Sequence, residues 1–274
     1  PIPTLLVQPK SGWARLNLRE LWAYRELAYF LVWRDVKVRY KQTVFGAAWA
    51  VIQPFMLMVV FTLFLGRVSG IAPPGVPYPL FTFSGLVPWT LFATSVIGSS
   101  DSLVGAAHII QKVYFPRLLL PAAAIGSHLL DFVIAIAVLS LLMLYFGFLP
   151  SLAVLWVIPL TVLVMATALA LGVWLSAINV RYRDVKHAVP FLVQVWLFAS
   201  PVAYSTDFVP EQWRTIYYLN PMAGIIDGFR WALLGHGEAA PVGPVLMAAG
   251  VTAVVLLLGL AYFRRVERTF ADVI

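Results

Sequence analysis

The densest group of chemically active side chains is a set of cations that stands directly before an apolar run. The run continues to Leu65, and the cations fill four of the eight positions before it: Arg34, Lys37, Arg39 and Lys41. Guanidinium and ammonium groups at this spacing bind anionic lipid headgroups or an acidic surface of another protein. They also hold one end of an apolar helix on the cytoplasmic side of a membrane. The chemistry they indicate is binding and orientation.

Residue sets that make or break bonds are missing from the sequence. No Gly-x-x-x-x-Gly-Lys-Ser/Thr phosphate loop occurs, so we expect no ATP site of that kind. The four histidines lack metal-ligand spacing, and there is no Gly-x-Ser-x-Gly elbow, no Asp-x-Asp pair and no cysteine. These absences disfavour a membrane-bound glycosyltransferase. We expect this chain to have no catalytic residue, no metal and no cofactor of its own.

The composition is that of an integral membrane protein. Of 274 residues, 61% are hydrophobic and only 11% are charged, whereas soluble domains carry about 25% charged residues. The formal charge of +7 would suggest nucleic acid binding in a soluble protein. Here the cations gather between apolar runs, so membrane topology explains them better and we expect no nucleic acid partner.

Six apolar runs are long enough to cross a bilayer core about 30 Å thick, which takes about 20 helical residues. We therefore predict an all-α membrane protein with six transmembrane helices. Their expected bounds are Phe45–Leu65, Pro79–Ile97, Leu118–Phe146, Leu152–Ile178, Ala188–Tyr204 and Val242–Phe263.

The distribution of cations predicts the orientation. Sixteen of the 19 lysines and arginines fall in the N-terminal region, in alternate loops or in the C-terminal tail; the other three are Arg67, Arg214 and Arg230. The positive-inside rule then places both termini in the cytoplasm. We divide the chain into a cytoplasmic N-terminal region (1–44), a six-span domain (45–263) and a cytoplasmic tail (264–274).

Two segments outside the spans show helical patterns. Near the N-terminus, Asn17 and Glu20 resemble a capping box, and apolar residues recur opposite charged ones as in a helix that lies in the membrane interface. The apolar face is Leu18, Leu21, Trp22, Tyr29 and Val32. Between spans five and six, positions 206–237 are expected to form two short re-entrant helices on the outer side. Pro210 and Pro221 would start them, with Asp227 and Arg230 paired on the second.

Polar side chains inside the spans are candidates for function. Asp131 lies near the middle of the third span, where an ionised carboxylate needs a partner, and His128 is one turn earlier. A proton relay needs more groups than these two, so we favour a structural hydrogen bond to a neighbouring helix.

Two helix faces are candidates for the lining of a sugar path, since aromatic rings stack on sugars and glutamine bonds hydroxyls. Packing between helices or against lipid is the alternative. The first span supplies Phe45, Trp49 and Gln53, and the fifth supplies Gln194 and Phe198, with Tyr204 near its outer end.

Five stretches in order resemble one family. The first is Arg34-Asp-Val-Lys-Val-Arg-Tyr-Lys-Gln-Thr-Val-Phe-Gly, followed by Trp49 and Gln53-Pro54. The others are His108–Arg117, Asp131-Phe132, Asn179–Lys186 and Tyr217–Met222. Together they are similar to the transmembrane subunit of type-2 ABC exporters, closest to the permeases that export O-antigen polysaccharide, with teichoic-acid and capsule exporters nearby.

The resemblance implies a homodimer of this subunit in the bacterial inner membrane, with two cytoplasmic ABC ATPase subunits that bind ATP and Mg. Lipid-linked polysaccharide would pass between the two permease copies. Positions 101–112 resemble the coupling helix that docks on the ATPase, with Asp101, Ser102, Gly105, His108 and Lys112 as candidates. A second contact would use Arg34, Asp35, Lys37 and Arg39, which can equally bind membrane lipids. A permease for another lipid-linked substrate and, more distantly, an ion-gradient-driven carrier are the alternatives.

Overall fold

The computed structural model describes residues 18–41, 46–66, 74–235, 239–267 and 270, and the regular structure in these ranges is helical, as predicted. The α-helices in chain order are α1 (Leu18–Ala23), α2 (Arg25–Tyr40), α3 (Trp49–Leu65), α4 (Tyr78–Gly105), α5 (Ala107–Ile110), α6 (Leu119–Ser127), α7 (Leu129–Tyr145), α8 (Val157–Arg181), α9 (Val185–Phe198), α10 (Glu211–Tyr217), α11 (Pro221–Leu234) and α12 (Val242–Val266). Short 3₁₀ turns stand at Gly46–Ala48, Leu152–Trp156 and Thr206–Phe208.

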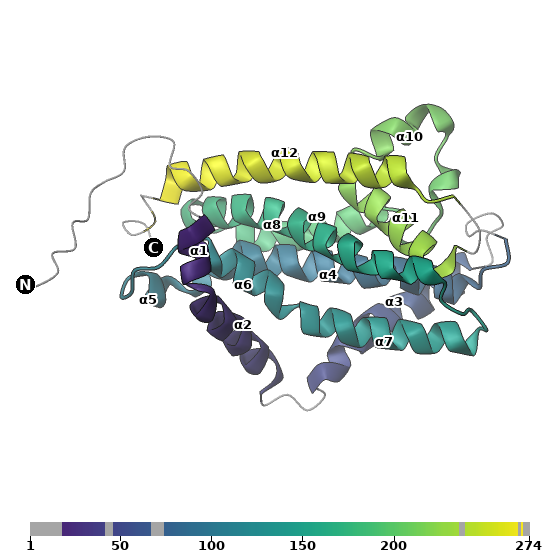
Figure 1. The fold of residues 1–274 in the computed structure, drawn as a ribbon, viewed down its shortest axis with the longest axis horizontal. Coiled ribbons are helices and arrows are strands. Elements are labelled where there is room, and N and C mark those ends of the chain that lie inside the picture. Colours follow the sequence, from purple (N-terminus) through teal and green to yellow (C-terminus); the bar gives the residue numbers. More distant parts are fainter. Residues whose placement is uncertain (1–17, 42–45, 67–73, 236–238, 268–269, 271–274) are drawn as a thin grey trace, which may run out of the picture.

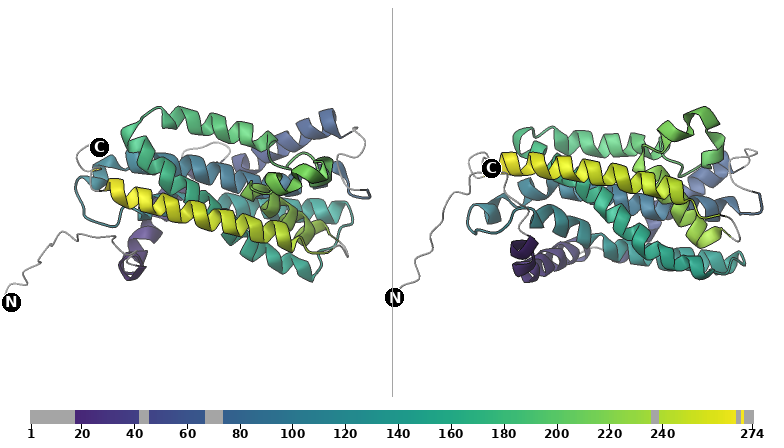
Figure 2. Two further views of the ribbon diagram at one scale, coloured as in Figure 1. Left: turned by 90° about the horizontal axis from the view of Figure 1, so that it is seen from above. Right: turned by 45° about the horizontal axis from the view of Figure 1, so that its top comes forward.

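The long helices form a bundle with two distinct ends (Figures 1 and 2). α1, α5 and the C-terminal end of α12 lie at one end, here called the α5 end. α10 and the start of α12 lie at the other, here called the α10 end. Four helical segments are long and apolar enough to cross a membrane, namely α4, α6 with α7, α8 with its preceding 3₁₀ turn, and α12. The remaining two predicted spans correspond to shorter apolar helices, α3 and α9.

α4 is the centre of the bundle and packs against α3, α6, α7, α8, α9 and α11. Most of its side chains are buried, with Phe83 and Phe92 fully so. Its contact with α8 depends on a small residue, because a Cβ at Gly172 would stand 2.6 Å from the Ser99 Cβ. Small residues that let two helix backbones approach closely are typical of membrane helices, because in lipid no hydrophobic effect drives the helices together.

Two predicted spans differ from the structure, and the helix of another is longer than its span. α4 continues to Gly105, eight residues beyond the expected end of the second span, and its polar last turns are partly covered by other helices. α9 ends at Phe198 because the chain turns at residues 199–204, which removes Tyr204 from the fifth span. The third span is not continuous, since α6 and α7 meet in a break at His128.

The N-terminal region forms two helices rather than one, and the expected cap Asn17 lies outside the described residues. α2 packs on α6, with Leu31 buried and Leu27 and Val32 partly buried beside it. Trp22 and Tyr29, predicted on the apolar face of a helix in the membrane interface, are 71% and 63% exposed. The apolar stripe that meets α6 therefore lies beside the aromatic residues, which remain on the outer surface.

The two helices expected before the last span are present, at α10 and α11. Pro210 precedes α10, and Pro221 is the first residue of α11. The Asn220 side chain caps α11 by accepting a hydrogen bond from the Met222 N–H at 3.1 Å. α11 is almost wholly buried against α4, α8 and α12, so it is part of the bundle core at this end.

The close packing of α4 and α8 predicts that replacing Gly172 destabilises the protein more than replacing a glycine that faces open space. Gly172→Val should lower the free energy of unfolding by about 1–3 kcal/mol, because the new side chain meets Ser99 and neither backbone has room to retreat. Thermal unfolding of the purified protein in detergent measures this. Gly250→Ala on α12 is the control, since a Cβ there has nothing within 4 Å. An equal loss of stability in both variants would contradict the packing argument.

Candidate functional site

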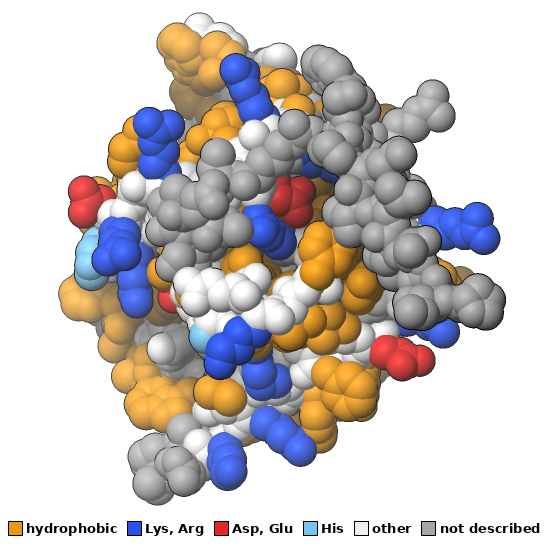
Figure 3. Space-filling model, turned by 90° about the vertical axis from the view of Figure 1, so that its left-hand side faces the viewer, with side chains coloured by type: hydrophobic (Ala, Val, Ile, Leu, Met, Phe, Trp, Pro, Cys, Tyr) orange, Lys and Arg blue, Asp and Glu red, His pale blue; other side chains and the backbone are white. Residues whose placement is uncertain are grey.

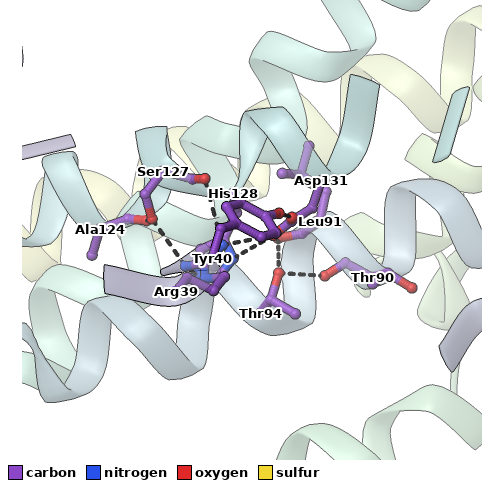
Figure 4. Close-up of polar contacts among 9 residues, drawn as sticks. All are labelled: Arg39, Tyr40, Thr90, Leu91, Thr94, Ala124, Ser127, His128 and Asp131. Carbon is purple, nitrogen blue, oxygen red and sulfur yellow. Dashed lines mark hydrogen bonds and ion pairs between the residues drawn. The ribbon is translucent and has the colours of Figure 1, made fainter. Parts of the chain in front are cut away.

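A charged cluster ties α2 to the junction of α6 and α7 (Figure 4). The Arg39 Nη1 donates to Asp131 Oδ2 at 2.6 Å. The Tyr40 hydroxyl donates to the other carboxylate oxygen, Asp131 Oδ1. Two neighbouring residues at the end of one helix thus hold both oxygens of one carboxylate, which stands in the first turn of α7.

Arg39 also occupies the break between α6 and α7. Its Nη2 donates to Ser127 Oγ at 3.1 Å, and Nη1 reaches the Ser127 carbonyl at 3.5 Å. In an uninterrupted helix that carbonyl would accept from the N–H of Asp131. Insertion of a side chain into the helical ladder is a recognised cause of a kink, and here the guanidinium donates to the Ser127 carbonyl beside the break.

The protonation pattern of His128 follows from the same contact. Arg39 Nη2 lies 3.2 Å from His128 Nε2, and a guanidinium can only donate, so Nε2 accepts. The ring proton therefore sits on Nδ1, which faces Asp131 Oδ2 at 3.6 Å. The His128 ring packs beside Gly98 of α4. His128 and Asp131 are neighbours, as their spacing suggested. Their hydrogen bonds, however, are made to Arg39, which lies between them.

This geometry corrects two predictions. Asp131 is not in the middle of an unbroken span but at the start of α7. Arg39, grouped with Arg34, Asp35 and Lys37 as an exposed contact surface, is turned toward α6 and α7 instead. The other three remain at the surface, where Arg34 pairs with its neighbour Asp35 at 2.8 Å and the Lys37 ammonium lies 5.2 Å from the centre of the Trp33 ring.

A cavity of about 180 Å³ adjoins the charged cluster. Its walls come from the end of α2, the start of α3, the middle of α4 and the first turns of α7. Trp49 and Gln53, two of the predicted path-lining residues, both face it. Phe45 lies outside the described residues. The residues from α4 are Val87, Thr90, Leu91 and Thr94, and Figure 4 shows Thr90 and Thr94 on the side of α4 near Tyr40 and Asp131.

The second predicted face does not line this cavity. Gln194 and Phe198 are exposed on α9, and the Phe198 ring lies 6.4 Å from that of Phe61 on α3. Tyr204 belongs to the turn after α9, where its hydroxyl is 2.9 Å from the Tyr217 hydroxyl. α3 and α9 are therefore neighbours, with outward faces that are apolar and aromatic.

The predicted coupling segment is divided at the α5 end. Asp101 and Ser102 belong to the last turns of α4, and Asp101 lies 3.9 Å from Lys186 in the first turn of α9. Gly105, His108 and Lys112 are exposed on and around α5. The single helix expected over 101–112 is thus absent, because Ala106 ends α4 and α5 is a separate turn.

Sequence reasoning missed two exposed apolar residues in the loop after α5. Tyr114 is 82% exposed and Val113 is 57% exposed, directly after the cation Lys112. Figure 3 views the α5 end and shows lysine and arginine side chains spread over it among hydrophobic ones. An apolar tip with a basic surround is the composition of a protein contact surface. The signal was present in the sequence as Lys-Val-Tyr-Phe in a loop.

The predicted pair of Asp227 and Arg230 is not a direct ion pair in the described structure. Asp227 accepts from Thr206 Oγ1 at 2.7 Å and from the Tyr218 hydroxyl at 3.0 Å. Burial raises the pKa of the Asp227 carboxyl, while the nearby guanidinium of Arg230 lowers it. Arg230 donates to the Val202 carbonyl at 2.7 Å and stacks on a phenylalanine ring of α4. These contacts fix α11 and the turn after α9.

Comparison with known proteins identifies relatives over nearly the whole chain. The sequence profile of the ABC-2 type transporter family matches residues 26–234. The O-antigen export system permease protein RfbA of Myxococcus xanthus is 32% identical over 258 residues, which are 93% of this chain and 98% of the relative. An RfbA from Klebsiella pneumoniae is 28% identical over 88% of this chain and 92% of the relative. The polysialic acid transport protein KpsM of Escherichia coli is 24% identical over 85% and 91%.

The charged cluster predicts a measurable coupling between α2 and α7. Asp131→Asn should lower the free energy of unfolding by about 2 kcal/mol, because it leaves the partly buried guanidinium without a counter-charge. Arg39→Gln should cost a similar amount. The double variant should cost clearly less than the sum, since the two changes remove one interaction. Chemical unfolding in detergent measures all three.

The matched control for this cycle is the exposed pair on the same helix. Asp35→Asn removes a carboxylate that pairs with Arg34 at the surface, and such pairs contribute about 0–1 kcal/mol. If Asp35→Asn destabilises as much as Asp131→Asn, or if the double variant is fully additive, the cluster does not hold α2 in place.

Proposed function

The chain belongs to the ABC-2 type transporter family, and we propose that it is the permease subunit of an ATP-driven exporter of lipid-linked polysaccharide. The observation that carries this conclusion is the match to O-antigen export permeases over about nine-tenths of both chains. The relatives are bacterial, and the apolar spans support a multi-pass protein of the inner membrane.

Energy for transport must come from a partner under this proposal. The sequence contains no glycine-lysine phosphate loop, so ATP and Mg are assigned to a separate cytoplasmic ATPase subunit. Two copies of each subunit would form the exporter. The neighbouring helices α3 and α9 support a second permease copy, because both are short, lie at the edge of the bundle and expose aromatic side chains, among them Phe64 and Phe191. A polysaccharide path between two copies would run along these faces.

Helix lengths support six membrane crossings despite the two short helices. Trp156, which caps the start of α8, and Trp174 within α8 are 18 residues apart, which is about 27 Å of helix. α3 and α7 have 17 residues each, about 25 Å. These lengths approach the 30 Å of a bilayer core, with tryptophans at its borders. The inner border then passes near His128 and Trp174, and the remaining turns of α4, α6 and α8 extend into the cytoplasm.

The cations support placing the α5 end in the cytoplasm. Exposed cations of this end lie on α2, around α5, in the loop after α8 and at the end of α12, for example Lys112, Arg183 and Arg265. The α10 end carries Arg214 and the buried Arg230. Both termini are cytoplasmic in this arrangement, and α2 lies at the inner interface with its exposed aromatic residues among lipid headgroups.

Two alternatives differ in how well the structure supports them. The polysialic acid relative favours a capsule-type substrate as the second candidate within the same class, and teichoic acid belongs with it. An ion-gradient carrier is disfavoured, because Asp131 is paired with Arg39 and Tyr40 rather than placed in a chain of titrating groups.

The proposal predicts that Tyr114 contacts the ATPase. Tyr114→Ala should weaken co-purification of the ATPase subunit by about tenfold or more, as expected for an exposed aromatic anchor. Export should fall with it, measured as surface polysaccharide in cells that express both subunits. Tyr145→Ala is the control, because Tyr145 is equally exposed at the opposite end of the bundle. If the Tyr114→Ala variant binds the ATPase subunit normally, Tyr114 is not part of the contact.

Orientation is tested with cysteines, which the natural chain lacks. Gln212→Cys on α10 should react with a membrane-impermeant maleimide in intact spheroplasts. Gln111→Cys beside α5 should react only after permeabilisation. Both glutamines are exposed, so a difference in reactivity reports the side of the membrane. The reverse pattern would contradict the orientation.

A further inference from the structure

The cavity beside the charged cluster is built within one copy of the chain. It lies between the end of α2, α3, α4 and α7, and has a volume of about 180 Å³. A space of this size holds several water molecules, which suits one sugar ring rather than a chain of them. It adjoins His128, which stands near the inner border of the membrane in the arrangement proposed above.

The charges at its wall are already balanced. Arg39 is the cation of the cavity and Asp131 the anion, and they bond each other at 2.6 Å. The second amino group of Arg39 contacts Ser127 and His128. A phosphate would have to displace these partners and would face the carboxylate at close range. The site therefore suits an uncharged ligand.

The remaining lining combines polar groups with flat apolar surface. The Gln53 amide has no hydrogen-bonding partner among the described residues. Thr90 adds a hydroxyl on the facing helix, and the Trp49 ring is 50% exposed. A hydrocarbon chain here would leave the amide unpaired, which is costly. A pyranose ring carries hydroxyls at its rim and C–H groups on its faces, so it matches both the amide and the indole.

We propose that this cavity binds one uncharged sugar unit of the transported glycan at the inner border of the membrane. Gln53 bonds the sugar hydroxyls, Trp49 stacks on the ring, and the balanced pair of Arg39 and Asp131 forms the polar wall. The site rests on the proposed function, and it gives each permease copy a binding position of its own, separate from a path between copies.

The test uses the cysteine-free chain. Thr94→Cys places a thiol in the cavity wall, and its reaction with a small membrane-permeant thiosulfonate is timed in lipid nanodiscs. The probes are octyl glucoside, octyl mannoside and octyl galactoside, with the octyl tetraethylene glycol ether as a sugar-free control, all below micellar concentration. At least one glycoside should slow the reaction about threefold or more relative to the ether, the effect of about one hydrogen bond.

Matched variants separate the cavity from general effects. Thr161→Cys on α8 is the thiol control, since Thr161 and Thr94 are both partly buried and both donate to the carbonyl four residues earlier. It should show no difference between glycoside and ether. In the Thr94→Cys background, Gln53→Leu should abolish sugar protection, whereas Gln194→Leu on α9 should retain it.

Three outcomes would overturn the site: no reaction of the thiol at position 94, no glycoside more protective than the ether, or full protection in the Gln53→Leu variant. Polysaccharide export by the natural chain with its ATPase is measured in parallel. If the protein exports polysaccharide but no glycoside protects the thiol, only the proposed sugar site is contradicted. If it exports no polysaccharide although the ATPase is functional, the proposed function itself is contradicted.

Discussion

A carboxylate close to the hydrocarbon part of a membrane must have a partner, and this requirement organises the half of the bundle toward the α5 end. Asp131 takes its partners, Arg39 and Tyr40, from the end of α2. The same arginine supplies the donor that the helix break at Ser127 needs. One set of contacts thus joins the end of α2 to the place where α6 meets α7. Loss of the carboxylate would leave a guanidinium without a counter-charge, which is why these positions depend on one another.

The lengths of the helices follow from this arrangement. α3 and α7 begin at the level of the cluster and are only as long as a bilayer core. α4, α8 and α12 are longer and carry the bundle past that level to the α5 end, where α2 covers α6. The exposed tip at Tyr114 lies at this end. A partner that pushes on the tip acts on α4 and α6, which are joined to α2 through His128 and Arg39. The geometry therefore offers a mechanical connection between the proposed ATPase contact at Tyr114 and the proposed sugar site beside the charged cluster.

The sequence was sufficient for the helical class, the existence of the apolar runs, and the helices after Pro210 and Pro221, because each depends on local composition or capping. It placed Trp49 and Gln53 on one face, and the structure puts that face at a cavity. It did not locate the break at His128, although Gly126 and Ser127 stand directly before it, because one glycine inside an apolar run does not by itself end a helix and the arginine that contacts the break lies 89 positions away. The end of α9 was placed too late because the turn at residues 199–204 remains apolar. Arg39 was assigned to the surface because charge alone does not say which cation turns inward.

Whether α2 is held against α6 by this cluster is the claim on which the account depends most. A Cβ at Gly126 would stand 3.1 Å from a methyl group of Val32, so cysteines at these positions are within reach of a disulfide. We expect rapid cross-linking of Val32→Cys with Gly126→Cys in native membranes, and clearly slower cross-linking when Arg39→Gln is added. No cross-link would contradict the docking of α2, and an unchanged rate in the Arg39→Gln background would contradict control by the charged cluster.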